Sequence, residues 1–256
     1  MTKFKSGHAI SQNILDALIF TGKIGIMSFK IWETHFAMGN YRWRKKQFAK
    51  LVEQKFFEKH RNHYAQRIFI LGEQGKFILN KMNQTIVLPP YVGLMEHDLF
   101  IGTSMILLEK AGLTNSWLSD RELRKQQDLL SPFQRRESDK KYPDAAFKIL
   151  INGSLRTVAL EYEKERKSIS RYRSILWNYA MMNSYSMVLY VLERPSIRLV
   201  LNKCLKDLDL FDLKNRLAFV DAKEWMRDPA RASITLGEDV FQLINFCELN
   251  SKMSSA

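Results

Sequence analysis

The chain has 256 residues, which is enough for one large domain or two small ones. Apolar residues make up 46% and charged residues 26% of it, so disorder along the whole chain is excluded. Lys and Arg number 40 against 27 Asp and Glu, and this net charge of +13 favours a polyanionic partner.

Cysteine usage and hydropathy indicate the compartment. Cys204 and Cys247 are too few for a disulfide scaffold or a four-ligand zinc site, and they fit a reducing cytosol. The start, MTKFKSGHAIS, lacks the apolar stretch of a secretory signal. The longest uncharged run, 174–192, contains Asn and Ser residues that argue against a membrane span. We therefore expect a cytoplasmic protein with no integral membrane segment.

The basic charge is concentrated in the first third of the chain. Residues 1–85 hold 15 basic and 5 acidic side chains, whereas the rest of the chain holds 25 and 22. A solvated surface is the ordinary meaning of such an excess. Its concentration in one small region favours a contact with nucleic acid instead.

Three helical segments open the chain. Apolar residues at helical spacing predict a first helix from Ile10 that stops near Thr21-Gly22, and a second over 27–36. Gly39-Asn40 is a turn of the kind that joins the helices of a helix-turn-helix. In the third segment, NYRWRKKQFAKLVEQ, four residues are expected in the core: Trp43, Phe48, Leu51 and Val52. Five face outward, as a DNA-recognition helix requires: Arg42, Arg44, Lys45, Lys46 and Lys50.

A strand pair with a basic tip follows this helix. Residues 55–57 and 67–71 predict two short strands around a polar tip, before a helix that starts at Gly75. We expect His60 and Arg61 of this wing to contact DNA. His60 and His63 have a spacing that metal ligands use on helices, but no third ligand is in view. A helical protein-interaction domain is the alternative for this region.

Leu88-Pro89-Pro90 cannot continue a helix and suits a linker. We expect a winged helix-turn-helix domain over 1–88, a second domain over 91–245 and a flexible tail over 246–256.

The second domain contains a cluster of carboxylates. Residues 147–151 and 154–163 predict two strands joined by an Asn152-Gly153 turn. Glu161 and Glu163 are two residues apart, so both project from one strand face, and hairpin pairing brings Asp144 beside them. Three clustered carboxylates repel one another unless a hard cation lies between them, and oxygen ligands select Mg²⁺ or Mn²⁺. We expect these three residues to bind such an ion and to act in catalysis.

Two lysines follow the second strand. Lys164 points to the opposite strand face, whereas Lys167 lies at the start of the next helix and can return over the carboxylates. A charged strand end is the alternative meaning of the Glu pair. A hairpin, a helix and then the buried strand 187–192 is, however, the order of the nuclease core of restriction endonucleases. The fold class we expect is α/β (α+β), with a restriction-endonuclease-like mixed sheet flanked by helices.

Other candidate residues have weaker support. Glu96 or Asp98 is a further candidate metal ligand and His97 a candidate proton donor, although acids are also common at a helix amino terminus. Arg171 is expected on the outer face of a helix, available to DNA. Tyr162 lies on the reverse strand face, which argues against a nucleophilic role.

The motifs together resemble a known family. Pro143-Asp144 followed by Glu161-x-Glu163 resembles the PD-(D/E)xK signature, with Glu at the usual position of Lys. With the winged helix before it, the stretch from Ile10 to Trp225 resembles the replication-relaxation group, and most of all the MobC-type relaxases of mobilisable plasmids.

The resemblance implies a function and its partners. Asp144, Glu161 and Glu163 would bind a divalent metal, Lys167 would be the catalytic base or cation, and one strand would be nicked at the plasmid's origin of transfer. Plasmid DNA, the relaxosome and a type IV coupling protein would be the partners. The alternative is a non-catalytic DNA-binding relaxosome accessory protein or repressor with a decayed nuclease core.

Overall fold

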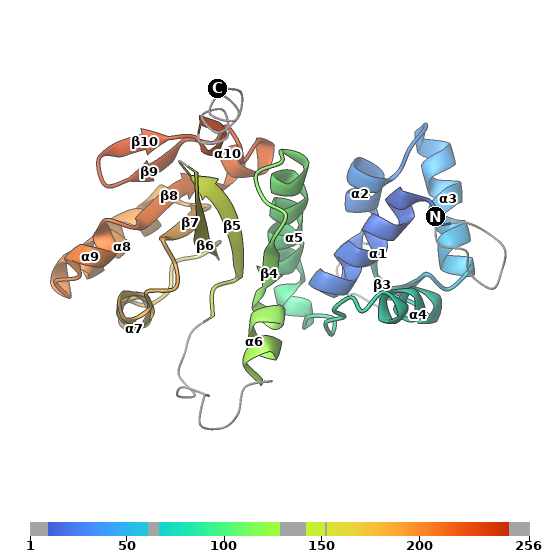
Figure 1. Ribbon diagram of the computed structural model, residues 1–256, viewed down its shortest axis with the longest axis horizontal. Helices are drawn as coiled ribbons and strands as arrows, with labels where there is room; N and C mark the ends of the chain where they lie inside the picture. Colours follow the sequence, from blue (N-terminus) through green and yellow to red (C-terminus); the bar gives the residue numbers. More distant parts are fainter. Residues whose placement is uncertain (1–9, 61–66, 129–141, 152, 246–256) are drawn as a thin grey trace. The chain divides into compact units, whose positions relative to one another are not determined.

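The computed structural model describes residues 10–60, 67–128, 142–151 and 153–245 (Figure 1). It forms two compact units, which divide between Thr103 and Ser104, inside helix α5 (Met95–Lys110). The domain limits expected at residues 88 and 91 stay predictions, and the expected tail lies outside the described residues. No helix in the described ranges is both long and apolar enough to cross a membrane.

The first unit has the order of a winged helix. Its elements are α1 (Gln12–Ile24), β1 (Met27–Ser28), α2 (Phe29–Ile31), the π-helical turn η1 (Trp32–Phe36), α3 (Tyr41–Glu53), β2 (Phe57–His60), β3 (Ile68–Leu71), α4 (Glu73–Lys81) and the 3₁₀ turn η2 (Val92–Leu94). The three strands form an antiparallel sheet in the order β1-β3-β2. Hairpin β2–β3 therefore follows α3 directly, as the sequence predicted for a wing.

Helix α3 is fixed by its cap and by aromatic packing. The side chain of Asn40 accepts a hydrogen bond from Trp43 N (3.0 Å), while Gly39 adopts a φ of +85° that suits glycine. Phe48 turns inward from α3 and stacks on Phe57 of β2, with ring centroids 5.5 Å apart. It also meets Phe69 of β3 edge-on at 4.5 Å. The inner face of α3 is therefore held against the wing.

The structure corrects three details of the first unit. Helix α1 continues to Ile24, because the left-handed Gly25 (φ +87°) ends it. The second helical stretch begins as strand β1, whose Met27 pairs with Phe69. Trp43 is 57% exposed and not in the core, because it lies in the first turn of α3 with its ring over Gly39.

The second unit contains a large mixed sheet. After α5 come β4 (Trp117–Ser119), α6 (Asp120–Asp128), β5 (Ala145–Ile151), β6 (Ser154–Glu163), α7 (Ile169–Met181), β7 (Met187–Leu192), α8 (Pro195–Asp207), α9 (Phe211–Lys214), β8 (Leu217–Asp221), α10 (Ala222–Arg227), β9 (Ile234–Leu236) and β10 (Asp239–Phe241). Seven strands lie in the order β10-β9-β8-β7-β6-β5-β4. Strands β6, β7 and β8 are parallel to one another, and the other pairs are antiparallel.

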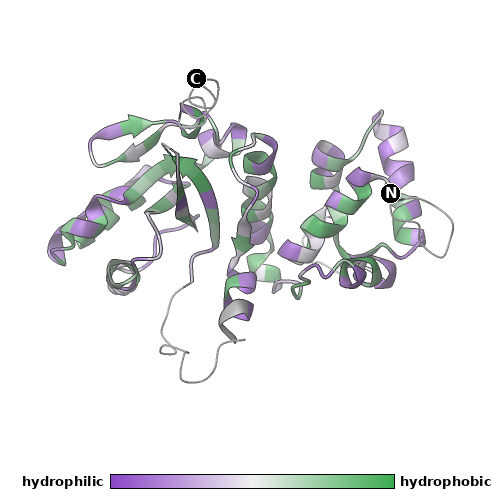
Figure 2. Cartoon of the chain, viewed as in Figure 1, coloured by the Kyte–Doolittle hydropathy of each residue, from purple (hydrophilic) through white to green (hydrophobic). Residues whose placement is uncertain are grey.

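The predicted fold class is confirmed by this topology. An antiparallel meander β4-β5-β6 leads through helix α7 to the parallel strand β7, which is the helix and strand order expected of a restriction-endonuclease-like core. All six residues of β7 are buried, as expected for a central strand covered on both faces. The central strands of this sheet are mostly hydrophobic (Figure 2).

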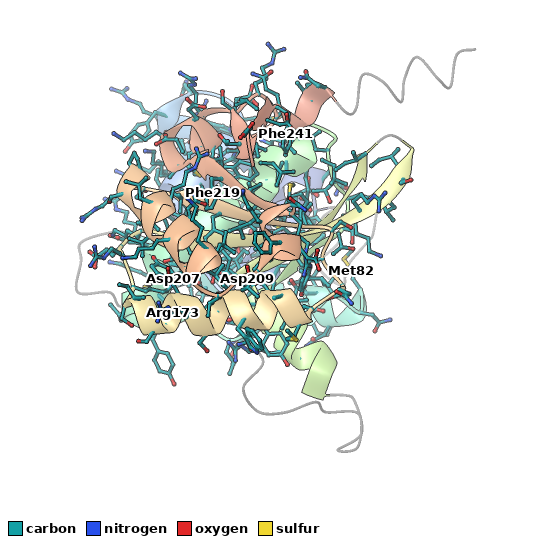
Figure 3. The ribbon with its side chains drawn as sticks, turned by 90° about the vertical axis from the view of Figure 1, so that its left-hand side faces the viewer. Met82, Arg173, Asp207, Asp209, Phe219 and Phe241 are labelled. Carbon is teal, nitrogen blue, oxygen red and sulfur yellow. The ribbon has the colours of Figure 1, made fainter. Side chains whose placement is uncertain are left out.

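Strand register determines which residues share a face of the sheet. Glu161 pairs with Tyr190, and Tyr190 pairs with Phe219, so these three side chains project from the same face. Helices α7, α8 and α9 cover that face and bury a common core with it (Figure 1). Arg173 of α7 forms an ion pair with Asp207 of α8 (2.6 Å; Figure 3), so this arginine is engaged within the unit.

Arg216 caps the carboxyl end of α7. Its guanidinium donates to the carbonyl oxygens of Tyr179 (2.7 Å), Met182 (2.7 Å) and Tyr185 (2.9 Å). The last carbonyl oxygens of a helix have no hydrogen-bond donor within the helix. The guanidinium of Arg216 supplies a donor to the carbonyl oxygens at this end of α7. Burial lowers the pKa of Arg216.

We predict that Arg216→Ala lowers the free energy of unfolding by about 2–4 kcal/mol, because three carbonyls lose a charged donor. Urea denaturation measures the change. Arg227→Ala, which removes an exposed arginine from α10, is the matched control and should shift stability by less than about 0.5 kcal/mol. Equal effects of the two substitutions would show that the cap is not stabilising.

Candidate active site and DNA-binding surface

Asp144 immediately precedes β5. The register pairs Ala145, the first residue of β5, with Leu160, so Asp144 comes opposite Glu161. The carboxylate of Asp144 accepts a hydrogen bond from Tyr162 N (2.8 Å). Antiparallel pairing therefore brings together two acids that are seventeen positions apart in the chain.

Glu161 and Glu163 are buried at the end of β6. Glu161 is 0% exposed and Glu163 is 2% exposed, and a buried carboxylate needs a donor or a cation beside it. The hydroxyl of Tyr179 donates to Glu161 Oε1. The ammonium of Lys167 forms an ion pair with Glu163 Oε1. Each carboxylate is thus compensated by a group from α7 or from the segment that leads into it.

Lys167 is positioned by its own backbone. Its N–H donates to the hydroxyl of Tyr172 (3.2 Å), and the next residue, Ser168, caps α7 by accepting from Arg171 N (3.3 Å). The PD-(D/E)xK signature has its lysine two positions after the acid, where this chain has Glu163. Here that glutamate holds the ammonium of a lysine four residues further along.

The tyrosines of this face have raised pKa values and stay protonated. Burial, with the charge of Glu161, raises the pKa of Tyr179 and of Tyr190 well above the usual value. Burial also raises the pKa of Tyr172. Tyr162 projects from the other face, where its hydroxyl donates to Glu193 (2.8 Å).

The donor set fits a divalent cation in part. In the described part of the chain, no three acidic, histidine or cysteine side chains are placed together as metal ligands. Glu163 forms an ion pair with Lys167, whereas Asp144 and Glu161, on neighbouring strands, accept hydrogen bonds from neutral donors, so their carboxylates are the candidate hard ligands. The fully buried hydroxyl of Tyr190, on the same face as Glu161, has no hydrogen-bond partner. An orphaned polar atom beside carboxylates fits a site that binds a further group.

Sequence reasoning missed three residues of this cluster. Tyr179 and Tyr190 carry no signal in the sequence beyond their positions on a helix and a strand. Asp120 opens α6, and its N–H donates to the carbonyl oxygen of Asp144 (3.0 Å). Burial raises the pKa of Asp120, and the negative charge of Asp144 adds to this rise.

The other candidates of the sequence analysis belong to two different units. Glu96, His97 and Asp98 are in the first turn of α5, in the first unit, where His97 Nδ1 is 3.2 Å from Asp98 Oδ1. Lys164 and Arg171 are exposed residues of the second unit, after β6 and on α7.

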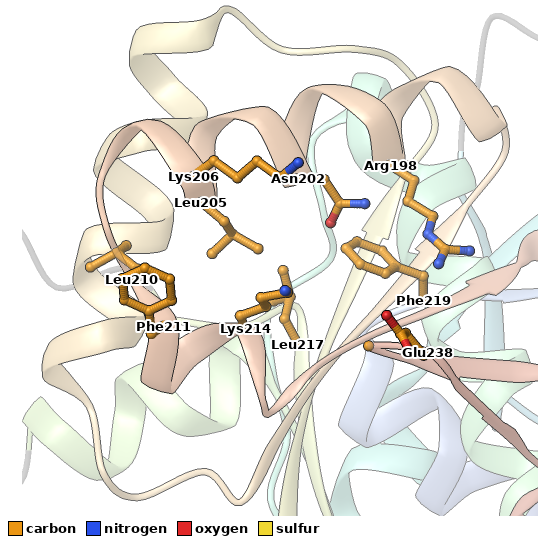
Figure 4. Close-up of a pocket in the computed structure, with 11 residues that line it drawn as sticks. Arg198, Asn202, Leu205, Lys206, Leu210, Phe211, Lys214, Leu217, Phe219 and Glu238 are labelled. Atoms are coloured by element: carbon orange, nitrogen blue, oxygen red, sulfur yellow. The ribbon is translucent and has the colours of Figure 1, made fainter.

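A separate cavity of about 330 Å³ lies between α8, α9 and the β9–β10 turn (Figure 4). Leu205, Leu217 and Phe219 are among its apolar lining, and Arg198 and Lys206 are among its cations. None of the four expected catalytic residues lines it, so it is not part of the carboxylate cluster.

The candidate DNA-binding residues lie on α3 and the wing. Arg42, Lys45, Lys46 and Lys50 are exposed. Arg44 differs from them: it is half-buried, and its guanidinium donates to the carbonyl oxygens of Gly39 (2.7 Å) and Glu33 (3.2 Å). His60 ends β2, whereas Arg61 and His63 lie outside the described residues.

Comparison with known proteins gives weak likenesses. No family model matches the chain, and no curated protein matches it. The structure of restriction endonuclease FokI matches with a TM-score of 0.31 and 11% identity, over 84% of this chain and 42% of that one. FokI bound to DNA matches with a TM-score of 0.27 and 11% identity, over 89% of this chain and 45% of that one. The chain thus spans less than half the length of either structure, and the fold assignment rests on its own topology.

Proposed function

We propose that the chain is a metal-dependent endonuclease that nicks one strand of DNA at a chosen site, as a relaxase does at a plasmid's origin of transfer. The observation that carries the proposal is the pair of opposed acids Asp144 and Glu161, with the Glu163–Lys167 ion pair next to them. These groups lie at the ends of β5 and β6, on one face of a sheet with nuclease-core topology.

The residues of this chain divide the chemistry among them. Asp144 and Glu161 would hold Mg²⁺ or Mn²⁺, and that ion supplies polarisation of the phosphate and a water of lowered pKa. Tyr179 orients the carboxylate of Glu161 through its hydroxyl. Lys167, held by Glu163, places a positive charge where negative charge develops on the phosphate.

Water is the nucleophile in this proposal, because three of the nearby tyrosines are engaged and burial raises the pKa of the fourth, Tyr190, well above its usual value. Tyr162 donates to Glu193, and Tyr179 donates to Glu161. Tyr172 accepts from Lys167 N, and its raised pKa makes a phenolate costly. A tyrosine nucleophile must lose its proton, and these surroundings oppose that loss.

The winged helix would choose the DNA site. Exposed cations on α3 suit phosphate contacts and base edges in the major groove. A cytoplasmic location, a relaxosome and a type IV coupling protein belong to this proposal as the setting of plasmid mobilisation.

A non-catalytic DNA-binding accessory protein or repressor is the second candidate. Lys167 forms an ion pair with Glu163, which removes that carboxylate as a metal ligand, and this observation favours the second candidate. Among the described residues, no three candidate ligands are placed together. Supercoiled plasmid with the cognate origin and Mn²⁺ separates the two. Open circles that require the origin support the nickase, whereas a mobility shift without open circles supports the accessory protein.

We predict that Asp144→Asn and Glu161→Gln each reduce nicking by at least about a thousandfold, because the ion loses a ligand. Origin binding should be unchanged, and loss of repulsion between the two acids should leave the melting temperature equal or higher. Glu165→Gln, at an exposed position of the same segment, is the control and should nick normally. Normal nicking by both active-site variants would contradict the assignment.

We predict that Lys167→Met lowers the free energy of unfolding by about 2–4 kcal/mol, because Glu163 is left buried and unpaired. It should also lower nicking at least about a hundredfold. The double variant Lys167→Met/Glu163→Gln should recover most of the stability but none of the nicking. Recovery of both would show that the lysine is only structural. Lys148→Met, an exposed position on β5, is the control.

We predict that replacing Arg42, Lys45, Lys46 and Lys50 together by Gln weakens origin binding and flattens the slope of log K against log salt. Each lost phosphate contact on duplex DNA flattens it by about 0.9. Lys76→Gln, on the exposed side of α4, should leave the slope unchanged. An unaltered slope in the fourfold variant would exclude α3 from the interface.

A further inference from the structure

The hydroxyl of Tyr190 is buried without a hydrogen-bond partner. Tyr190 is 0% exposed, and its oxygen is one of few buried side-chain atoms in the described residues that lack one. Buried polar groups are nearly always paired, because an unmade hydrogen bond in the interior is costly. A hydroxyl left unpaired at the centre of the sheet therefore calls for an explanation.

The surroundings of this hydroxyl are the carboxylates of the candidate site. Tyr190 is the register partner of Glu161 on the neighbouring parallel strand, so the two side chains lie side by side on one face. Burial raises the pKa of this phenol, and the charges of Glu161, Glu163 and Asp144 raise it further. The hydroxyl therefore stays protonated and able to donate a hydrogen bond.

Glu161 already has one tyrosine donor. Tyr179, from α7, holds Glu161 Oε1, while Tyr190, from β7, is placed beside the same residue without bonding to it. The ring of Tyr190 has little freedom to move away, because it packs against Phe219 with ring centroids 6.2 Å apart. A small rotation of the Glu161 carboxylate is thus the simplest way for Tyr190 to gain an acceptor.

We propose that Tyr190 is a positioning residue for the divalent cation: when Glu161 turns to ligate the ion, it accepts a hydrogen bond from the Tyr190 hydroxyl. The hydrogen bond from the Tyr190 hydroxyl to Glu161 then forms only when the ion is bound. Ion binding and hydrogen-bond formation are coupled, and the coupling raises the affinity for the ion. This inference rests on the proposed function, because it takes Glu161 as a ligand.

The test is Tyr190→Phe, which removes only the hydroxyl. Affinity for Mn²⁺ is measured on the full chain without DNA, from the electron paramagnetic resonance signal of free Mn²⁺. The affinity should fall about tenfold to a hundredfold, as is usual when a partner of a metal ligand is removed. Melting temperature without the ion should be equal or higher, because no hydrogen bond is lost in that state. Tyr185→Phe is the control, since that half-buried hydroxyl also feels the charge of Glu161, and its affinity for Mn²⁺ should be unchanged.

The outcomes separate this inference from the proposed function. Equal Mn²⁺ affinity in the wild type and Tyr190→Phe overturns the role of Tyr190 and leaves the nuclease proposal intact. Lower stability of ion-free Tyr190→Phe with equal affinity also overturns it, because the hydroxyl would then have a permanent partner. A wild type that binds no Mn²⁺ overturns both. A wild type that binds Mn²⁺ but nicks nothing, with weaker binding in Tyr190→Phe, supports the inference and contradicts only the nuclease proposal.

Discussion

Strand β6 brings two carboxylates into the interior on one face, and the charge of each must be compensated there. Helix α7 meets this requirement near both of its ends. Lys167, just before the helix, pairs with Glu163, and Tyr179, in its last turns, bonds to Glu161. The Ser168 cap at one end of α7 and the Arg216 cap at the other hold the helix in that position. The fold of the second unit and its candidate chemistry therefore depend on the same contacts.

The sequence predicted the elements whose patterns are local. Alternation along 154–163 places Glu161 and Glu163 on one face, and the hairpin before them brings Asp144 opposite. The hairpin, helix and buried strand that the sequence predicted correspond to β5, β6, α7 and β7, whereas β4, β8, β9 and β10 were not predicted. The aromatic spacing of 40–54 likewise predicted the inward Phe48 and the exposed cations around it.

The features that sequence reasoning missed arise from contacts between distant segments. Strand β1 forms only because Met27 meets Phe69, more than forty residues later. Arg44 resembles its basic neighbours in sequence, yet it donates to the carbonyl oxygens of Gly39, in the turn before α3, and of Glu33, in η1. The role of Tyr179 and Tyr190 was missed for the same reason. Their spacing on α7 and β7 indicates core positions, and only the contacts between α7, β6 and β7 show that they lie beside Glu161.

The central claim is that Asp144 and Glu161 form the ligand pair of a divalent cation, with Lys167 kept beside them by Glu163. The most direct measurement is anomalous scattering from crystals of the protein soaked in Mn²⁺. We expect a manganese peak within ligand distance of both Asp144 and Glu161, while the ammonium of Lys167 remains paired with Glu163. An absent peak, or a peak that touches neither carboxylate, would contradict it.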